Sequence, residues 1–170
     1  MRSIRFLATL ALVTLLAGGA EAQSSPAAPP VANASNQPHP EMPAEFRAPI
    51  SLFIEGFQNR DAAKIAAAHA PSPTIIDEFA PFVWTGPSAL LAWGTDLQKY
   101  MGGSNVSVRF DPPRYEMMHG ENGYVILGSI ITVKTSSQVY RSAGTFTLAL
   151  TKTEKGWLIK AWAYTAVPEF

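Results

Sequence analysis

The sequence has no cysteine among its 170 residues and few charges, only 15% of the chain. Without cysteine the chain forms no disulfide, and it lacks the preferred ligand of structural zinc. The formal net charge is +0, and no basic run occurs in the body of the chain. Because phosphate binding needs clustered Lys and Arg, we expect no nucleic acid as a partner. The 47% of hydrophobic residues are enough for a core that holds without covalent links.

Signatures of cofactors and metals are also missing. No two of the three histidines stand at metal-ligand spacing. No phosphate loop, dinucleotide fingerprint or G-x-S-x-G motif occurs. The sequence therefore predicts no metal and no cofactor.

The N-terminus carries a short hydrophobic run. Two arginines precede the apolar stretch from Phe6 to Leu16, and Ala20-Glu21-Ala22 has the small-x-small form of a cleavage site. The stretch is shorter than the roughly 20 residues that a membrane span needs. We expect residues 1–22 to be a signal peptide and the chain to be exported, to the bacterial periplasm or the extracellular space, with no membrane contact after cleavage. An uncleaved anchor is the alternative.

The segment that follows has a different composition. Residues 23–43 are rich in Pro, Ala, Ser and Asn and show no apolar periodicity. Such a segment buries too little surface to offset its ordering entropy, so we predict a disordered linker. The folded domain is expected at residues 44–168.

Three helices are predicted before the strands begin. The first has apolar residues at steps of four, three and four, which are Phe46, Ile50, Phe53 and Phe57. Its regular part is expected from Pro49 onward, because proline is tolerated only near a helix start. Asp61 is expected to cap a second, short helix. A third helix opens at Pro87 and closes at Gly102-Gly103.

The remaining segments read as strands. The sequence TIIDEF, residues 74–79, is a short strand, and four longer strands follow residue 104. Pro112-Pro113 predicts a bulge or bend, and Asn122-Gly123 and Glu154-Lys155-Gly156 predict tight turns. Helices followed by consecutive hairpins indicate an α+β domain with a curved antiparallel sheet.

One strand is apolar on both of its faces. Residues 124–133 carry aliphatic or aromatic side chains at both parities, as expected of a strand that is covered on both sides. Helices cover one face, and a second copy of the chain is the simplest cover for the other. Trp162 and Tyr164 share the parity of Lys160, so we expect a homodimer through an outer face that includes Ile131, Trp162 and Tyr164. The alternative is an ordinary central strand with incidental outer apolar residues.

The segment DEFAPFVWTGPSA and the final GWLI strand resemble the SnoaL-like branch of the nuclear transport factor 2-like superfamily. The resemblance covers Ala44 to Val167 and implies a cystatin-like cone, in which a bent sheet wraps a long helix and leaves a pocket. The superfamily includes ketosteroid isomerase, polyketide cyclases, dehydratases and members without a known reaction, so it implies no single chemistry. The pocket-facing positions that it implies in the last strand are Ala161 and Ala163, with Thr165 beyond them as a ligand contact. Alanine moves no proton, which weakens the enzyme interpretation.

Two adjacent carboxylates are the main chemical candidates. In a strand Asp77 and Glu78 point to opposite faces, so they cannot act as a pair and at most one of them faces the cavity. Asp77 shares its parity with Ile75 and Phe79. Facing an apolar pocket, it would have a raised pKa and could serve as a general acid or base. Alternatively, it accepts backbone hydrogen bonds and shapes the following loop.

Aromatic residues supply the remaining candidates. Trp84 and Trp93 are expected to stack on a ligand, and Tyr115 to line the pocket mouth. A contact in the core is the alternative for Trp93. His69 is expected to end a helix, where the helix dipole favours a charged imidazole.

Together these features predict an exported SnoaL-like protein that binds a small apolar or aromatic molecule in its cone cavity. A cofactor-free isomerase, cyclase or dehydratase that uses Asp77 as general acid or base is the second hypothesis. A non-catalytic structural or interaction module is the third.

Overall fold

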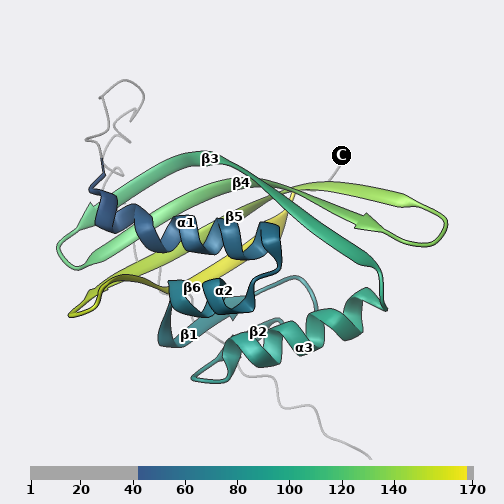
Figure 1. The fold of residues 1–170 in the computed structure, drawn as a ribbon, viewed down its shortest axis with the longest axis horizontal. Coiled ribbons are helices and arrows are strands. Elements are labelled where there is room, and N and C mark those ends of the chain that lie inside the picture. Colours follow the sequence, from purple (N-terminus) through teal and green to yellow (C-terminus); the bar gives the residue numbers. More distant parts are fainter. Residues whose placement is uncertain (1–41, 168–170) are drawn as a thin grey trace, which may run out of the picture. The chain divides into compact units, whose positions relative to one another are not determined.

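The computed structural model describes residues 42–167, which form three helices packed on a six-stranded sheet (Figure 1). The helices are α1 (Ala44–Asn59), α2 (Ala62–Ala68) and α3 (Ala89–Met101). The strands are β1 (His69–Ile76), β2 (Val83–Thr85), β3 (Asn105–His119), β4 (Asn122–Lys134), β5 (Val139–Thr153) and β6 (Gly156–Ala166). The predicted signal peptide and nearly all of the predicted linker lie outside the described residues. Within them, no helix combines the length and the apolar character that a membrane crossing requires.

The sheet is curved and open, with the strand order β2-β1-β6-β5-β4-β3. The α+β class is confirmed. All neighbouring strands are antiparallel except β1 and β6, which run parallel. Strand β6 follows β5 in an antiparallel hairpin, and its other edge pairs with β1 in the same direction. All three helices lie on the concave side of the sheet (Figure 1).

Helix α1 begins at Ala44, five residues before the start that Pro49 suggested. Proline in the second turn removes one backbone hydrogen bond, to the carbonyl of Glu45. The earlier turn, however, buries Phe46 completely, beside Ile50 and Phe53. Burying one such side chain contributes about 1.5–3 kcal/mol, comparable to the cost of the proline, so the helix extends through it.

The ends of the other helices follow local chemistry. Asp61 caps α2 as predicted, with Oδ1 accepting hydrogen bonds from the backbone of Ala63 at 3.0 Å and Lys64 at 3.1 Å. Helix α3 begins at Ala89, two residues after Pro87, and ends at Gly102, which takes a left-handed conformation (φ 55°). The predicted stop at glycine is confirmed.

The β3–β4 hairpin turns at Gly120-Glu121, not at Asn122-Gly123, which are the first residues of β4. Gly123 serves close packing instead: a Cβ there would lie 2.4 Å from Cε2 of Phe46. The predicted bulge at Pro112-Pro113 is confirmed, since the register of β3 shifts on both sides of Pro113.

An irregularity in β6 reverses the side-chain pattern that its sequence suggested. Leu150 pairs with Ile159 and Ala149 pairs with Ala161, so Lys160 is an extra residue without a partner on β5. Such a bulge moves all later side chains to the opposite face. Trp162 therefore points inward and is only 2% exposed.

The expected composition of the outer face is therefore wrong. Trp162 and Tyr164, at 2% and 8% exposed, lie on the concave side, and Ile131 lines a cavity there. The prediction counted the strand alternation from Lys160, and it was wrong because Lys160 is itself the bulged residue. Whether the chain forms a homodimer is a separate question.

The core is an aromatic cluster between α1 and the concave side. Phe53 of α1 lies 5.7 Å from Phe146 and 6.0 Å from Trp162 between ring centroids, and Phe146 lies 5.5 Å from Trp162. Phe57, one helical turn further along α1, packs edge-on against Trp162 at 6.1 Å. This cluster fills one part of the concave side and leaves the end near α3 open.

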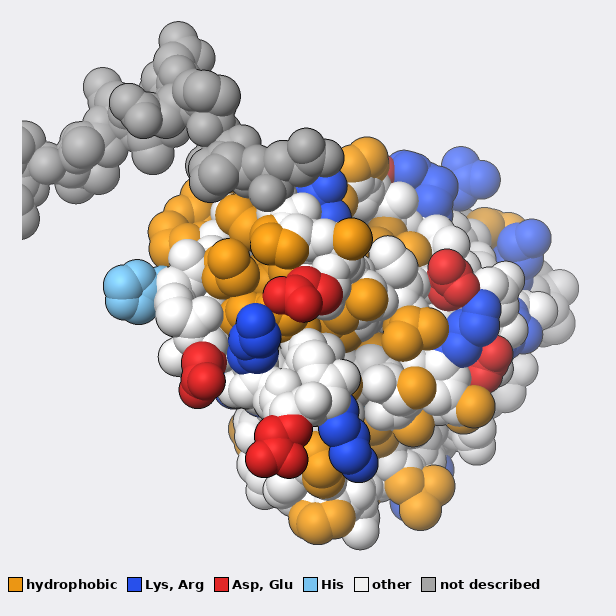
Figure 2. All heavy atoms as spheres, turned by 60° about the vertical axis from the view of Figure 1, so that its left-hand side comes forward, with side chains coloured by type: hydrophobic (Ala, Val, Ile, Leu, Met, Phe, Trp, Pro, Cys, Tyr) orange, Lys and Arg blue, Asp and Glu red, His pale blue; other side chains and the backbone are white. Residues whose placement is uncertain are grey.

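The surface mixes apolar and charged side chains. Figure 2 brings forward the end of the sheet with the β3–β4 and β5–β6 turns, where apolar side chains gather and charges of both signs are interspersed. Arg47 of α1 pairs with Glu116 of β3 at 2.7 Å. An exposed pair of this kind contributes at most about 1 kcal/mol, so the aromatic core rather than surface charge sets the position of α1.

A glycine on β5 makes room for Tyr164. A Cβ at Gly144 would lie 2.4 Å from Cε2 and 2.5 Å from the hydroxyl oxygen of Tyr164. We expect Gly144→Ala to lower the free energy of unfolding by about 1–3 kcal/mol, because the packed ring must move. Gly94→Ala is the control: nothing lies within 4 Å of its Cβ, and helix propensity predicts a gain of up to about 1 kcal/mol. Urea denaturation measures both, and equal midpoints for the two variants would contradict this packing.

Candidate functional site

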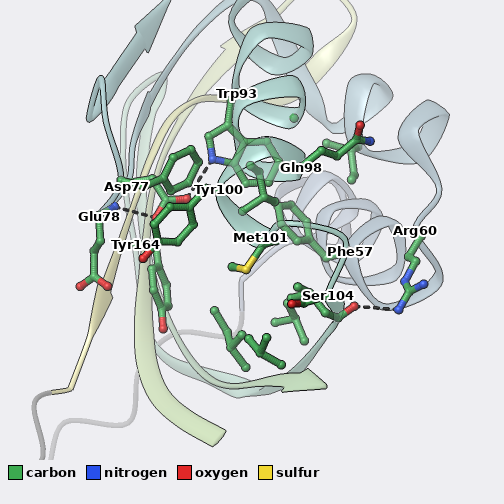
Figure 3. A pocket seen from close by; sticks show the side chains of 18 of the residues that line it. Phe57, Arg60, Asp77, Glu78, Trp93, Gln98, Tyr100, Met101, Ser104 and Tyr164 are labelled. Carbon is green, nitrogen blue, oxygen red and sulfur yellow. Dashed lines mark hydrogen bonds between the residues drawn. The ribbon is translucent and has the colours of Figure 1, made fainter. Parts of the chain in front are cut away.

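A cavity of about 730 Å³ opens between α3, the C-terminal end of α1 and the concave side of the sheet (Figure 3). Its wall is mainly aliphatic and aromatic, with contributions from Phe57, Trp93, Met101, Val108, Ile131 and Phe146. A few polar groups interrupt this wall, among them Asp77, Tyr164 and Arg60. Pockets of this size and character are typical of small-molecule sites.

Asp77 lies in the wall immediately after β1. Its Oδ2 accepts a hydrogen bond from Nε1 of Trp93 at 2.8 Å, and its Oδ1 accepts one from the backbone of Glu78 at 2.8 Å. Burial against the apolar wall raises the pKa of the Asp77 carboxyl, and the two hydrogen bonds counteract part of that rise. Asp77 is thus both a wall residue and an acceptor that shapes its own loop.

The register of the sheet places Tyr164 beside Asp77. Ile75 pairs with Trp162 in the parallel ladder between β1 and β6, and two residues further along the chains come Asp77 and Tyr164. Figure 3 shows the two side chains next to each other. Burial raises the pKa of the Tyr164 hydroxyl, a hydrogen bond with Ser142 lowers it, and the negative charges of Glu78 and Asp77 raise it further.

The two carboxylates are not in a strand. Strand β1 ends at Ile76, so Asp77 and Glu78 belong to the loop before β2, and both contribute to the cavity wall. The strand alternation on which we based the expectation that at most one of them faces the cavity does not apply here, although Figure 3 shows the Glu78 carboxylate pointing away from the cavity. Their roles differ nonetheless: Oε1 of Glu78 accepts a hydrogen bond from the backbone of Ala166 at 2.6 Å and ties the loop to the end of β6.

Of the two tryptophans predicted to contact a ligand, only Trp93 lies in the cavity wall. Trp93 lies in the wall as expected, and its ring also packs edge-on against Trp162 at 5.2 Å, so it serves both wall and core. Trp84 is not part of the wall. It is 5% exposed, donates a hydrogen bond from Nε1 to Oδ2 of Asp96 at 3.0 Å, and packs on Phe79, which fixes β2 to α3.

Tyr115 and Thr165 lie away from the cavity. Tyr115 packs edge-on against Tyr124, whose ring is 41% exposed, at 6.2 Å. Thr165 is exposed and pairs with Thr145 across the outer side of β5 and β6. The bulge at Lys160 reversed the alternation on which the placement of Thr165 depended.

His69 ends α2 as its C-cap, as expected, but its side chain is buried. Its Nδ1 lies 2.6 Å from the carbonyl oxygen of Ile65, and burial lowers the pKa of the imidazole. The ring is 5% exposed and lies outside the cavity wall.

Sequence reasoning missed two of the polar wall residues, Tyr164 and Arg60. Tyr164 was assigned to the outer face because the bulge at Lys160 leaves no signal in the side-chain alternation. Arg60 was not among the candidates from the sequence. Among residues 42–167, no group of three or more His, Asp or Glu side chains is arranged to hold a metal ion.

Comparisons with solved structures identify the fold. A ketosteroid isomerase-like protein from Erwinia carotovora atroseptica matches with TM-score 0.61 at 14% identity, over 74% of this chain and 96% of the other. Hexachlorocyclohexane dehydrochlorinase LinA-type3 from Novosphingobium barchaimii matches with TM-score 0.62 at 12% identity, over 74% and 86%. An NTF2-like protein with a cystatin-like fold from Novosphingobium aromaticivorans matches with TM-score 0.61 at 13% identity, over 75% and 82%.

These matches cover most of each structure and confirm the expected cystatin-like fold. No protein-family model and no curated protein sequence matches the chain. At such identities the likeness establishes fold and not activity.

The raised pKa of Asp77 predicts a pH-dependent stability. Its contribution to stability is fully present below the unfolded-state pKa of about 3.9 and is lost as pH rises through the higher folded-state pKa. Asp77→Asn cannot ionise, so the free energy of unfolding of this variant, minus that of the wild type, should increase as pH rises from about 3.5 to 7. Urea denaturation across that range measures it, with Glu154→Gln in the β5–β6 turn as a control for lost charge. A difference that stays constant with pH would contradict a desolvated Asp77.

Proposed function

We propose that the chain binds a small apolar or aromatic molecule in the cavity beneath α3. The observation that carries the proposal is the cavity itself: about 730 Å³ with a mainly apolar wall, at the open end of the fold. A structural module whose side chains filled the cone would leave no such space, so this alternative is less well supported. An empty apolar volume of drug-like size gains most from an occupant that displaces water from its wall.

Two polar groups would orient such a molecule. The carboxyl of Asp77 and the side chain of Tyr164 lie on the same side of the cavity (Figure 3), with the Tyr164 hydroxyl toward Gly144 and Ser142 of β5, and they provide one donor and several acceptors. A ligand hydroxyl or carbonyl placed between them would be held in one orientation.

The same pair supports a second candidate function, a cofactor-free proton transfer. Burial raises the pKa of Asp77, which brings a general acid or base closer to neutral pH. Tyr164 would donate a hydrogen bond to an oxyanion that develops on the substrate. An isomerase, cyclase or dehydratase needs such an arrangement, but the wall holds no histidine to assist Asp77. Binding is therefore the primary proposal.

Export belongs to the proposal as well. The charged start, short apolar run and small-x-small site at residues 20–22 support secretion through a signal peptide. N-terminal sequencing of the mature chain from the periplasm or medium should begin at Gln23, and a chain that begins at Met1 would refute cleavage.

A homodimer through the outer side of the sheet is also proposed, on a corrected set of residues. All helices pack on the other side (Figure 1), and small or aliphatic residues make up much of the outer side, with the guanidinium of Arg114 lying over Gly128 of β4. The small or aliphatic residues are Ile126, Ile130, Thr145, Thr147, Ala149, Ala161 and Ala163. Depletion of charged residues is typical of an interface centre.

Light scattering after size exclusion tests the dimer. The mature chain should elute with twice the mass of one copy. Thr147→Arg should reduce it to one copy, because Thr147 pairs with Ala163 at the centre of this side and a buried, unpaired charge is costly. A single-copy mass for the wild type at micromolar concentration would refute the dimer.

A pair of adjacent substitutions tests ligand binding. Ile131 lines the cavity, whereas its neighbour Ile130 points to the outer side of the same strand. Compounds from a panel of steroids and naphthols that bind the wild type by calorimetry should bind Ile130→Trp equally and should not bind Ile131→Trp, whose ring occupies the cavity.

Equal binding by both variants, or no binding by the wild type, would refute the pocket proposal. Mass spectrometry of the compounds recovered after incubation separates the second candidate function. A new product that forms with the wild type but not with Asp77→Asn would establish proton transfer.

A further inference from the structure

Arg60 stands in the cavity wall in a fixed position. It ends α1 in a left-handed conformation (φ 58°), which directs its side chain across to the start of β3. There its Nη2 donates hydrogen bonds to the carbonyl oxygen of Val106 at 2.8 Å and to the side-chain oxygen of Asn105. Both hydrogens of that nitrogen are used, so the guanidinium is held in place before any ligand arrives.

No carboxylate of residues 42–167 forms an ion pair with Arg60. Among residues 42–167, Arg47, Arg109 and Arg114 each form an ion pair, whereas Arg60 forms none. Its Nε and Nη1 likewise make no hydrogen bond within the described residues. Among residues 42–167, Arg60 is also the one basic residue that lines the cavity. A fixed, unneutralised guanidinium beside apolar surface favours an anionic group on an otherwise apolar ligand.

The polar groups of the wall lie at opposite ends. Figure 3 shows Asp77, Glu78 and Tyr164 on one side and Arg60 on the other, with Phe57 and Met101 between them. The acidic end repels a negative charge, so an anionic group would be placed at the Arg60 end. A second negative charge on the ligand would meet Asp77 and Glu78 without a cation, so one charge fits better than two.

We infer that the molecule bound in this cavity is an aromatic or alicyclic monocarboxylic acid, whose carboxylate pairs with Arg60 and whose distal hydroxyl or carbonyl meets Asp77 and Tyr164. The inference deepens the proposed function and rests on it. The apolar wall favours a ligand with a ring system, and Arg60 favours a ligand with one negative charge. The distance between the two polar ends of the cavity limits the length of the ligand. Because both hydrogens of Nη2 are taken, a carboxylate oxygen accepts a single charge-assisted hydrogen bond, from Nε or from Nη1 of Arg60.

Two probes of nearly equal shape test the charge preference: 6-hydroxy-2-naphthoic acid and its primary amide. Calorimetry at pH 7 should give the acid a dissociation constant about tenfold lower than that of the amide, because a charge-assisted pair replaces a neutral hydrogen bond. Arg60→Gln should remove this difference by weakening only the acid, and Arg60→Lys should keep part of it. Arg109→Gln is the matched control, since Arg109 pairs with Asp111 away from the cavity wall, and it should leave both dissociation constants unchanged.

The outcomes distinguish this inference from the pocket proposal. If the wild type binds the amide as tightly as the acid, or if Arg60→Gln weakens both equally, the carboxylate assignment is overturned and the pocket stands. If neither probe binds, the pocket proposal falls and this inference falls with it. Acid binding that Arg60→Gln does not change would likewise overturn the role of Arg60.

Discussion

The extra residue in β6 is the constraint on which the rest of the structure depends. Without the bulge at Lys160, Trp162 and Tyr164 would point to the outer side of the sheet, opposite Trp157 and Ile159. With it, Trp162 joins the aromatic cluster of Phe53 and Phe146. The same shift brings Tyr164 to the cavity and leaves small residues on the outer side. One unpaired residue thereby sets the core, the site and the character of the free face.

The site balances two opposing effects at Asp77. Burial disfavours the charged carboxylate, while the indole of Trp93 and the backbone of Glu78 donate hydrogen bonds that favour it. Trp93 is itself held by its contact with Trp162, so the acid is positioned by the core and not by a flexible loop alone. A rigid carboxyl in an apolar wall suits both ligand orientation and proton transfer, which explains why the two candidate functions share one residue.

The sequence predicted the fold well where local chemistry decides it. The cap at Asp61, the stop at Gly102, the bend at Pro113 and the loop motif that begins at Asp77 all led to the right architecture. The wrong predictions concern side-chain facing and follow from a shift in strand register. A bulge adds one residue to a strand and moves every later side chain to the opposite face of the sheet. The sequence of residues 156–166 contains no signal for the bulge. Trp162, Tyr164 and Thr165 were therefore assigned to the wrong sides.

The site was predicted in part for the same reason. Asp77 and Trp93 were found because they adjoin strong signals, a short strand and a helix with a clear apolar stripe. Arg60 could not be predicted from the sequence, because its guanidinium is held by the start of β3, 45 residues further along the chain. Trp84 looked like a rim residue because an aromatic in a loop suggests exposure, but Asp96 binds its indole inside the fold.

The central claim is that a ligand occupies the cavity beside Trp93. Nitrogen-15 labelling of the indoles allows the claim to be tested directly, because the wall contains Trp93 whereas Trp84 and Trp157 lie outside it. During titration with a bound naphthoic acid, the Nε1–H resonance of Trp93, which donates to Asp77, should shift while those of Trp84 and Trp157 stay in place. A titration that leaves the Trp93 resonance unmoved, or that shifts all of them alike, would contradict the account.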